Sequence, residues 1–322
     1  MTDNNNQDMK KKPNVTTESL CFPDTPDSTL SAVKKRLIES SHDIIMNDPY
    51  GIIYQHSVLC QVSLPYKNPG NTVRHWERKQ GKAKLRIEAG SILNPITNNY
   101  HEVGLPYGTK SRLILTHLNS EALKKGSAII DVESSLTAFV KRLGLAAHGR
   151  DIRDIKDHLA RISASIVRLG YIDGQHTLQV NTNIVRALNL WFEKNEDQKI
   201  IWPSTIQLSD DYFDSLVKHA VPLDERALAA LSHSPMGLDV YSWLAQRLHR
   251  ISANKPQFIT WVALNDQFGY NYIRIRDFKS AFREILIMVH SQYHEAKFDL
   301  NEQGITLKNS PPPIGKKQFL IL

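Results

Sequence analysis

The residues that could perform covalent chemistry fall in incomplete patterns. Residues 144–151 have the glycine spacing of a phosphate-binding P-loop, but arginine and aspartate replace its lysine and magnesium-binding hydroxyl. No His-x-His pair occurs, so the metal site of a DNA-nicking enzyme is missing. His158 and Arg161 have the spacing found in tyrosine recombinases without the flanking residues of those enzymes. Cys21 and Cys60 are too few for a zinc site or a disulfide framework. We therefore expect no enzyme activity, no catalytic residue, no metal and no cofactor.

Basic residues are more informative, because they cluster. The 322 residues include 40 Lys and Arg against 33 Asp and Glu, a formal net charge of +7. Residues 67–86 contain seven basic residues and one acid, residues 141–168 seven and three, and residues 247–255 three and none. Clustered positive charge is typical of surfaces that bind nucleic acid, so the distribution favours DNA as the partner.

The composition also restricts the location of the protein. Hydrophobic residues make up 41% of the chain, which is enough for a packed core. No apolar run approaches the ~18 residues that span a bilayer, and the polar start of the chain is not a signal peptide. We expect a cytoplasmic protein that is not associated with a membrane.

The elements that must position the basic residues follow one order twice. In the first half the predicted elements are a helix over 108–125, a strand over 129–132, helices over 134–143 and 150–167, and a hairpin over 171–176. In the second half they are a helix over 236–251, a strand over 257–260, helices over 261–268 and 272–292, and a hairpin over 297–308. Two strings, Arg-Asp-Ile-Lys from residue 153 and Arg-Asp-Phe-Lys from residue 276, fall at equivalent places.

This order is that of a winged helix. We expect an α+β protein, mainly helical, with two tandem winged-helix domains and small β-hairpin wings. The expected organisation is a disordered polar arm (1–30), an N-terminal winged-helix domain for DNA contact and dimerisation (31–195), a C-terminal DNA-binding winged-helix domain (196–313) and a tail (314–322).

The last helix of such a domain enters the major groove of DNA, with one apolar face inward. At 100° per residue, the residues expected to face DNA are Arg150, Arg153, Asp157 and Arg161 in the first domain, and Tyr272, Arg276, Lys279, Ser280 and Arg283 in the second. The first group has an alternative interpretation. Its acids and arginines lie four residues apart, so this face could be a solvated surface of ion pairs.

Several motifs resemble RepA-type plasmid replication initiators of proteobacteria. They are residues 104–113 (GLPYGTKSRL), 149–156 (GRDIRDIK), 221–227 (VPLDERA), 238–248 (LDVYSWLAQRL), 276–283 and 310–313. The resemblance implies a protein that binds repeated sites (iterons) in the double-stranded DNA of its own plasmid origin and controls copy number. It therefore also implies association with the nucleoid or the plasmid. It also implies origin opening, loading of host replication proteins such as a helicase and the host origin initiator, a homodimer–monomer equilibrium and repression of its own promoter. The alternatives are a plasmid-encoded winged-helix repressor without replication activity and a DNA-rearranging enzyme.

Overall fold

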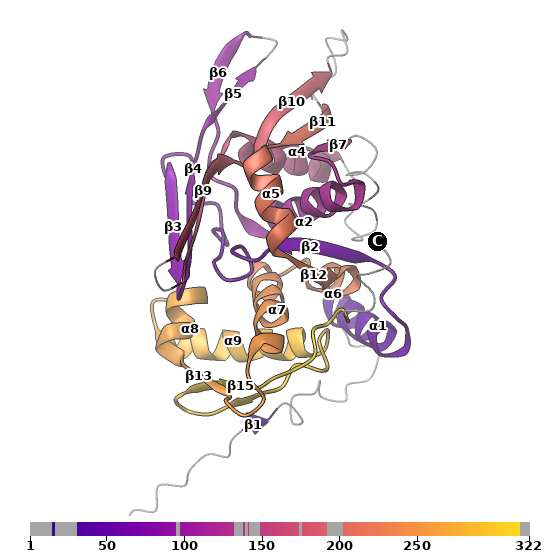
Figure 1. Ribbon diagram of the computed structural model, residues 1–322, viewed down its shortest axis with the longest axis vertical. Helices are drawn as coiled ribbons and strands as arrows, with labels where there is room; N and C mark the ends of the chain where they lie inside the picture. The colour runs from indigo at the N-terminus through magenta and orange to yellow at the C-terminus, as the bar shows by residue number, and fades with distance from the viewer. Residues whose placement is uncertain are drawn as a thin grey trace, which may run out of the picture.

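The computed structural model describes residues 15–16, 31–94, 97–131, 138, 141, 149–173, 176–191 and 202–315. In these residues, helices combine with small antiparallel sheets (Figure 1). The buried hydrophobic residues form a continuous core that includes both halves of the chain. No described helix has the length and apolar character needed to cross a membrane.

The elements of the first part of the chain are β1 (Val15–Thr16), α1 (Ala32–Met46), β2 (Ile52–His56), β3 (His75–Gln80), β4 (Ala83–Glu88), β5 (Ser91–Asn94), β6 (Asn99–Glu102), α2 (Gly108–Lys125), β7 (Ile129–Asp131), α4 (Gly149–Ala164), β8 (Ile166–Asp173), β9 (His176–Asn183), β10 (Val185–Trp191) and β11 (Trp202–Leu208). Those that follow are α5 (Asp210–His219), β12 (Ala220–Asp224), α6 (Glu225–Leu231), α7 (Pro235–Arg247), a 3-10 turn (Leu248–Arg250), β13 (Gln257–Thr260), α8 (Trp261–Phe268), α9 (Ile275–His290), β14 (Phe298–Leu300) and β15 (Gly304–Leu307).

The second half contains each helix and strand predicted for it, with slightly shifted ends. The central strand β15 pairs antiparallel with both β13 and β14, so the predicted hairpin and the predicted strand form one sheet. At the edge of this sheet β1 pairs with β14, which places two residues of the expected arm beside the C-terminal elements. The helix α8 begins where the hydroxyl of Thr260 accepts a hydrogen bond from the Ala263 amide.

The helix α2 has the predicted bounds. Gly126 ends it in the left-handed conformation, with φ at +60°, and its amide donates to the carbonyls of Ala122 and Leu123. Lys124 and Lys125 lie in the last turn, where positive charge suits the helix dipole.

The sheets of the first half differ from the prediction. The hairpin predicted at 171–176 is present as β8 and β9, but it joins β3 and β4 in the sheet β3-β4-β8-β9. The strand β7 instead pairs with β11, which pairs with β10. A turn motif predicts that the two strands beside it pair. Which further strand joins them in a sheet depends on whether its apolar side chains pack with those of the hairpin. Leu85 lies opposite Leu169 and Ile87 opposite Val167, and all four are buried.

Two further strands, which the sequence indicates over 52–64 and 85–93, also have different bounds. The apolar run 52–64 continues as a strand only to residue 56, and the run 85–93 is divided between β4 and β5. The helix predicted over 134–143 lies outside the described residues apart from positions 138 and 141. The expected domain boundary at 195/196 falls between β10 and β11, which pair with each other.

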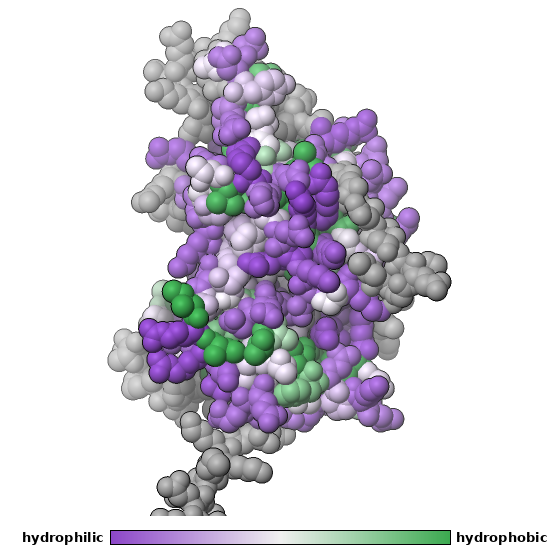
Figure 2. Space-filling view, turned by 90° about the vertical axis from the view of Figure 1, so that its left-hand side faces the viewer, coloured by the Kyte–Doolittle hydropathy of each residue, from purple (hydrophilic) through white to green (hydrophobic). Residues whose placement is uncertain are grey.

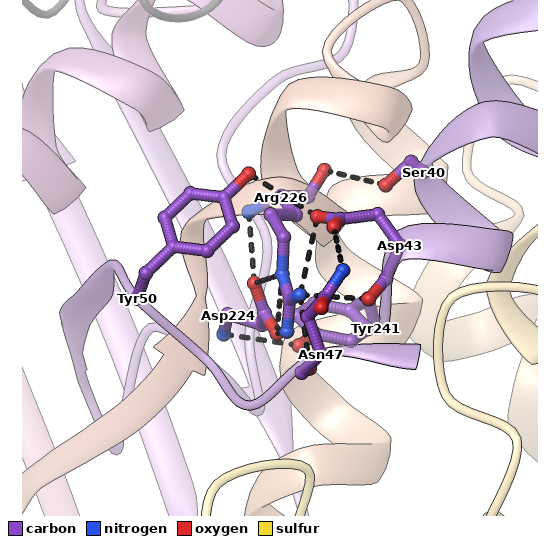
Figure 3. Close-up of polar contacts among 7 residues, drawn as sticks. All are labelled: Ser40, Asp43, Asn47, Tyr50, Asp224, Arg226 and Tyr241. Carbon is purple, nitrogen blue, oxygen red and sulfur yellow. Dashed lines mark hydrogen bonds and ion pairs between the residues drawn. The ribbon is translucent and has the colours of Figure 1, made fainter. Parts of the chain in front are cut away.

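The guanidinium of Arg226 joins α1 to the start of α6 (Figure 3). Its Nε and Nη2 donate to the carboxylate of Asp224, at 3.0 and 2.7 Å. Its Nη1 donates to the carbonyls of Asp43 and Asn47 and to the Asp43 carboxylate. Tyr50 covers the guanidinium at 5.0 Å and donates its hydroxyl to Asp43. Arg226, a residue of the 221–227 motif, is therefore structural.

A second buried arginine joins α2 to α7. Arg112 donates from Nε and Nη2 to the two carboxylate oxygens of Asp239, at 2.7 and 2.8 Å. It also donates to the carbonyls of Leu64, Pro65 and Gly108. Burial raises the pKa of Asp239, and the adjacent Arg112 opposes this shift. The 104–113 and 238–248 motifs thus meet in the core.

Candidate nucleic-acid interface

An aromatic core holds α9 and leaves its opposite face in solvent. Phe278 and Phe282 are fully buried, and the Phe282 ring lies 6.2 Å from Trp261 and 5.5 Å from Phe268. Tyr272, one of the residues predicted to contact DNA, is half-buried and packs on Phe278 at 5.7 Å. Tyr272 therefore lies at the edge of the core, beside the start of α9.

Four residues predicted to contact DNA share the outer face of α9: Arg276, Lys279, Ser280 and Arg283. Spacings of three, four and seven residues place them in one row along the helix. The side chain of Arg276 is 81% exposed, and Ser280 is also exposed. This face therefore presents a long cationic side chain and a hydroxyl near the helix start.

Two cations of this row rest on Trp261. The Lys279 ammonium lies 5.7 Å and the Arg283 guanidinium 5.1 Å from the indole ring, and both side chains are half-buried. Lys279 also donates to the carbonyl of Glu302, in the turn between β14 and β15. Packing on a flat ring reduces the conformational freedom of each side chain, so little further entropy is lost when it binds an anion.

Sequence reasoning missed Arg274, because it placed the start of the helix at residue 272. Arg274 immediately precedes α9 and its side chain is 72% exposed. Asp277 lies 3.7 Å from Arg274 and 3.6 Å from Arg276. Exposed pairs of this kind contribute about 0–1 kcal/mol, so a DNA phosphate can compete with Asp277 for either arginine.

Exposed apolar side chains lie at the start of α9 and on β13 and α8. Ile273 is fully exposed, and Val262, Ile275 and Phe258 are exposed to a lesser degree. In Figure 2, which shows the side on which β3 and α8 lie in Figure 1, hydrophobic residues gather in the lower half among hydrophilic ones. Apolar groups beside cations suit a DNA groove, where thymine methyl groups can contact them.

The helix α4 presents fewer free cations than its sequence indicates. Three residues of its expected apolar stripe, Ile155, Leu159 and Ile162, are buried in the core, whereas Ile166 is exposed and begins β8. Arg153 and Asp157, two residues predicted to contact DNA, are exposed. The Arg150 side chain lies outside the described residues.

Arg161, also predicted to contact DNA, is only 8% exposed. Its Nε donates to Asp157 at 2.7 Å, and its guanidinium lies 5.3 Å from the Tyr107 ring. A Cβ at Gly104 would lie 2.3 Å from Nη1 of Arg161, so the glycine of the 104–113 motif lets the guanidinium approach the backbone. The Asp157–Arg161 ion pair of the alternative interpretation is present, but its arginine is buried and not solvated. Arg161 packs inside the protein.

The histidine of the recombinase-like spacing is structural as well. His158 is buried, and its Nδ1 lies 2.9 Å from the Ser111 hydroxyl. Burial lowers the pKa of His158 to about 4, so the ring is neutral at physiological pH. Among the described residues, no group of three or more His, Cys, Asp and Glu could hold a metal ion.

The helices, small sheets and exposed basic residues define a candidate nucleic-acid-binding protein. Residues 105–263 match the family model described as plasmid-encoded RepA protein. The resemblance to RepA-type plasmid replication initiators is thereby confirmed. The match includes α4 and ends within α8, so α9 lies outside it.

No curated protein matches the chain. Two similar solved structures both contain domains 2 and 3 of RctB. A selenomethionine derivative is 11% identical with a TM-score of 0.49, over 79% of this chain and 98% of that one. The other structure is 12% identical with a TM-score of 0.47, over 78% and 96%.

Proposed function

We propose that the protein is a plasmid replication initiator that binds repeated origin sites sequence-specifically, mainly through the outer face of α9. The observation that carries the proposal is the row of Arg276, Lys279, Ser280 and Arg283 on a helix packed by its aromatic face. A helix held in this way can enter the major groove, where arginine and lysine bind guanine and phosphates. The match of residues 105–263 to the RepA family model supports replication initiation as the outcome of binding.

The proposed architecture is a pair of winged helices. In the second, α7, β13, α8, α9 and the β14–β15 hairpin follow in the order of that fold, and β15 pairs with β13. In the first, α2, β7 and α4 are followed by the β10–β11 hairpin, and β11 pairs with β7. The β8–β9 hairpin is then an insertion between the last helix and the wing.

The first domain contributes less to base recognition in this proposal. With Arg161 buried, the candidates on the outer face of α4 are Arg153, Asp157 and Arg150. We assign this domain phosphate contacts and dimerisation. Bending or opening of the origin, loading of host helicase and repression of the promoter would follow from occupancy of several repeats.

The groove assignment is tested by Arg276→Ala and Arg283→Ala. Each should weaken binding to the selected origin site by ~1–3 kcal/mol, the usual value of a lost base or phosphate contact. The assay is a titration of labelled duplex at fixed salt, with Lys34→Ala as the control, because Lys34 is exposed on α1, outside the two proposed winged helices. Unchanged affinity in both α9 variants would refute the assignment.

Replication itself needs a separate test. A plasmid that carries only this gene and its upstream repeats should replicate in a permissive host. If the protein binds these repeats and represses its own promoter but the plasmid does not replicate, the protein is a repressor.

A further inference from the structure

The tip of the β3–β4 hairpin presents two lysines without a counter-charge. Lys79 and Lys84 lie directly opposite each other in the register, and both are exposed. Among the described residues, no carboxylate lies within ion-pair distance of either one. Like charges directly opposite on neighbouring strands destabilise a sheet, so this pair is a cost to the isolated protein that a bound anion would remove.

Lys79 and Lys84 lie on the outer face of the sheet, and the other charged residues described on this face form ion pairs. One step from the tip, Glu77 lies opposite Arg86, with their charged groups 3.7 Å apart. Glu88 lies 2.9 Å from Arg86 and 2.5 Å from Arg168 of β8. The Arg168 hydrogen bond lowers the pKa of Glu88. The unpaired positive charge of the sheet is thus concentrated at the hairpin tip.

The residue of β8 directly opposite Lys84 is a glycine. Lys84 faces Gly170, and a Cβ at that glycine would lie only 3.3 Å from the Lys84 Cβ. The glycine therefore places no side chain directly opposite Lys84. A phosphate can therefore approach the lysine from the direction of β8.

The inner face of the hairpin is fixed to the turn before α9. The Arg78 guanidinium lies between two rings, 4.2 Å from Trp76 and 4.5 Å from Tyr270. The Tyr66 amide donates a hydrogen bond to the Tyr270 hydroxyl, and the Trp76 indole donates to the Ser63 carbonyl at 2.9 Å. The strand β3 also contacts α8 (Figure 1). These contacts place the hairpin tip on the same side as the start of α9.

We propose that the β3–β4 hairpin is a phosphate clamp: Lys79 and Lys84 bind the backbone of the DNA duplex next to the base pairs that α9 reads. This inference rests on the proposed function and gives a role to the basic stretch 67–86. The bound group is the phosphodiester backbone, so the clamp adds affinity and orientation without reading sequence. Because Arg78 and Tyr270 fix the hairpin, its distance from α9 is set before DNA binds.

The test uses the full chain and a duplex selected from a random-sequence pool by the wild-type protein. Lys79→Gln and Lys84→Gln are combined, because glutamine keeps most of the side-chain length and removes the charge. The control combines Lys34→Gln and Lys35→Gln, two exposed lysines of α1, which lies on the other side of the molecule (Figure 1). Circular dichroism and thermal unfolding check that both variants are folded.

The affinity of each protein is measured over a range of salt concentrations. Each lost phosphate contact lowers the slope of log K against log salt by ~0.9, so the hairpin variant should lose ~1.8 and the control nothing. Wild-type preference for the selected duplex over a scrambled one should persist in the hairpin variant. Trimming the duplex stepwise from the end nearest the hairpin should abolish the difference between the two proteins.

An unchanged slope in the hairpin variant would overturn the clamp while leaving the proposed function intact. A wild-type protein that selects no duplex would instead overturn the proposed function. A slope that falls equally in the control variant would show that the charge acts through the whole protein, which also overturns the clamp.

Discussion

The Arg112→Met substitution should destabilise the fold more than any exposed charge substitution. Arg112 makes two hydrogen bonds to Asp239 and three to backbone carbonyls in the core. Methionine fills much of the space and restores none of these bonds. The Asp239 carboxylate would remain in the core without its partner.

Removal of one member of a buried ion pair costs roughly 3–5 kcal/mol, because the remaining charge loses its compensation. Against a total of about 5–15 kcal/mol for a typical protein, this is a large fraction. The matched comparison is Arg186→Met. Arg186 and Asp210 are also 2.7 Å apart but are 57% and 70% exposed, so this pair contributes at most about 1 kcal/mol.

The assay is urea unfolding, followed by tryptophan fluorescence and by circular dichroism to check that the two transitions coincide. The double variant Arg112→Met, Asp239→Leu should be more stable than Arg112→Met alone, because no isolated charge remains. A loss below about 1 kcal/mol in Arg112→Met, or a double variant that loses the sum of the two single changes, would refute this reasoning.

Two further predictions concern acid sensitivity and a helix end. Burial lowers the pKa of His56 to about 3 and that of His158 to about 4. In the unfolded chain both histidines have the ordinary pKa of 6.5, so they take up a proton as the pH falls below 6.5. Stability should therefore fall between pH 6.5 and 4 by roughly 1.4 kcal/mol per pH unit for each histidine, and His56→Gln should remove the part of the slope that His56 contributes in urea titrations. Gly126→Ala should cost about 1 kcal/mol because of its positive φ, and Gly126→Asn less; equal thermal midpoints for the two variants would contradict this.

The sequence predicts best those elements whose signals are local. The helix α2 was predicted with its bounds, since Gly126 is a strong end signal, and the Asp-Gly turn correctly predicted that β8 and β9 pair. The partner of that hairpin depends on β3 and β4, which lie far away in the chain. No local pattern specifies such a partner, so the order of the elements does not show that β7 pairs with β11 and not with the β8–β9 hairpin.

The same limit applies to the candidate site. Helical spacing placed Arg276 and Ser280 on the exposed face of α9, and Phe278 and Phe282 in the core. The spacing on α4 is as regular, yet Arg161 is buried, because Gly104 and Tyr107 come from another segment to surround it. A helical wheel shows which residues face away from the helix stripe, but not what packs on them.

The pairing of β2 with β12 and the Arg226 network affect how the protein can be dissected. The segment 31–56 is early in the chain, yet α1 and β2 pack on α6 and β12 of the later part. A fragment that begins near residue 196 would leave β12 as an open edge and Arg226 without Asp43. The two halves are interlaced rather than modular, so a usable DNA-binding fragment would have to retain residues 31–56.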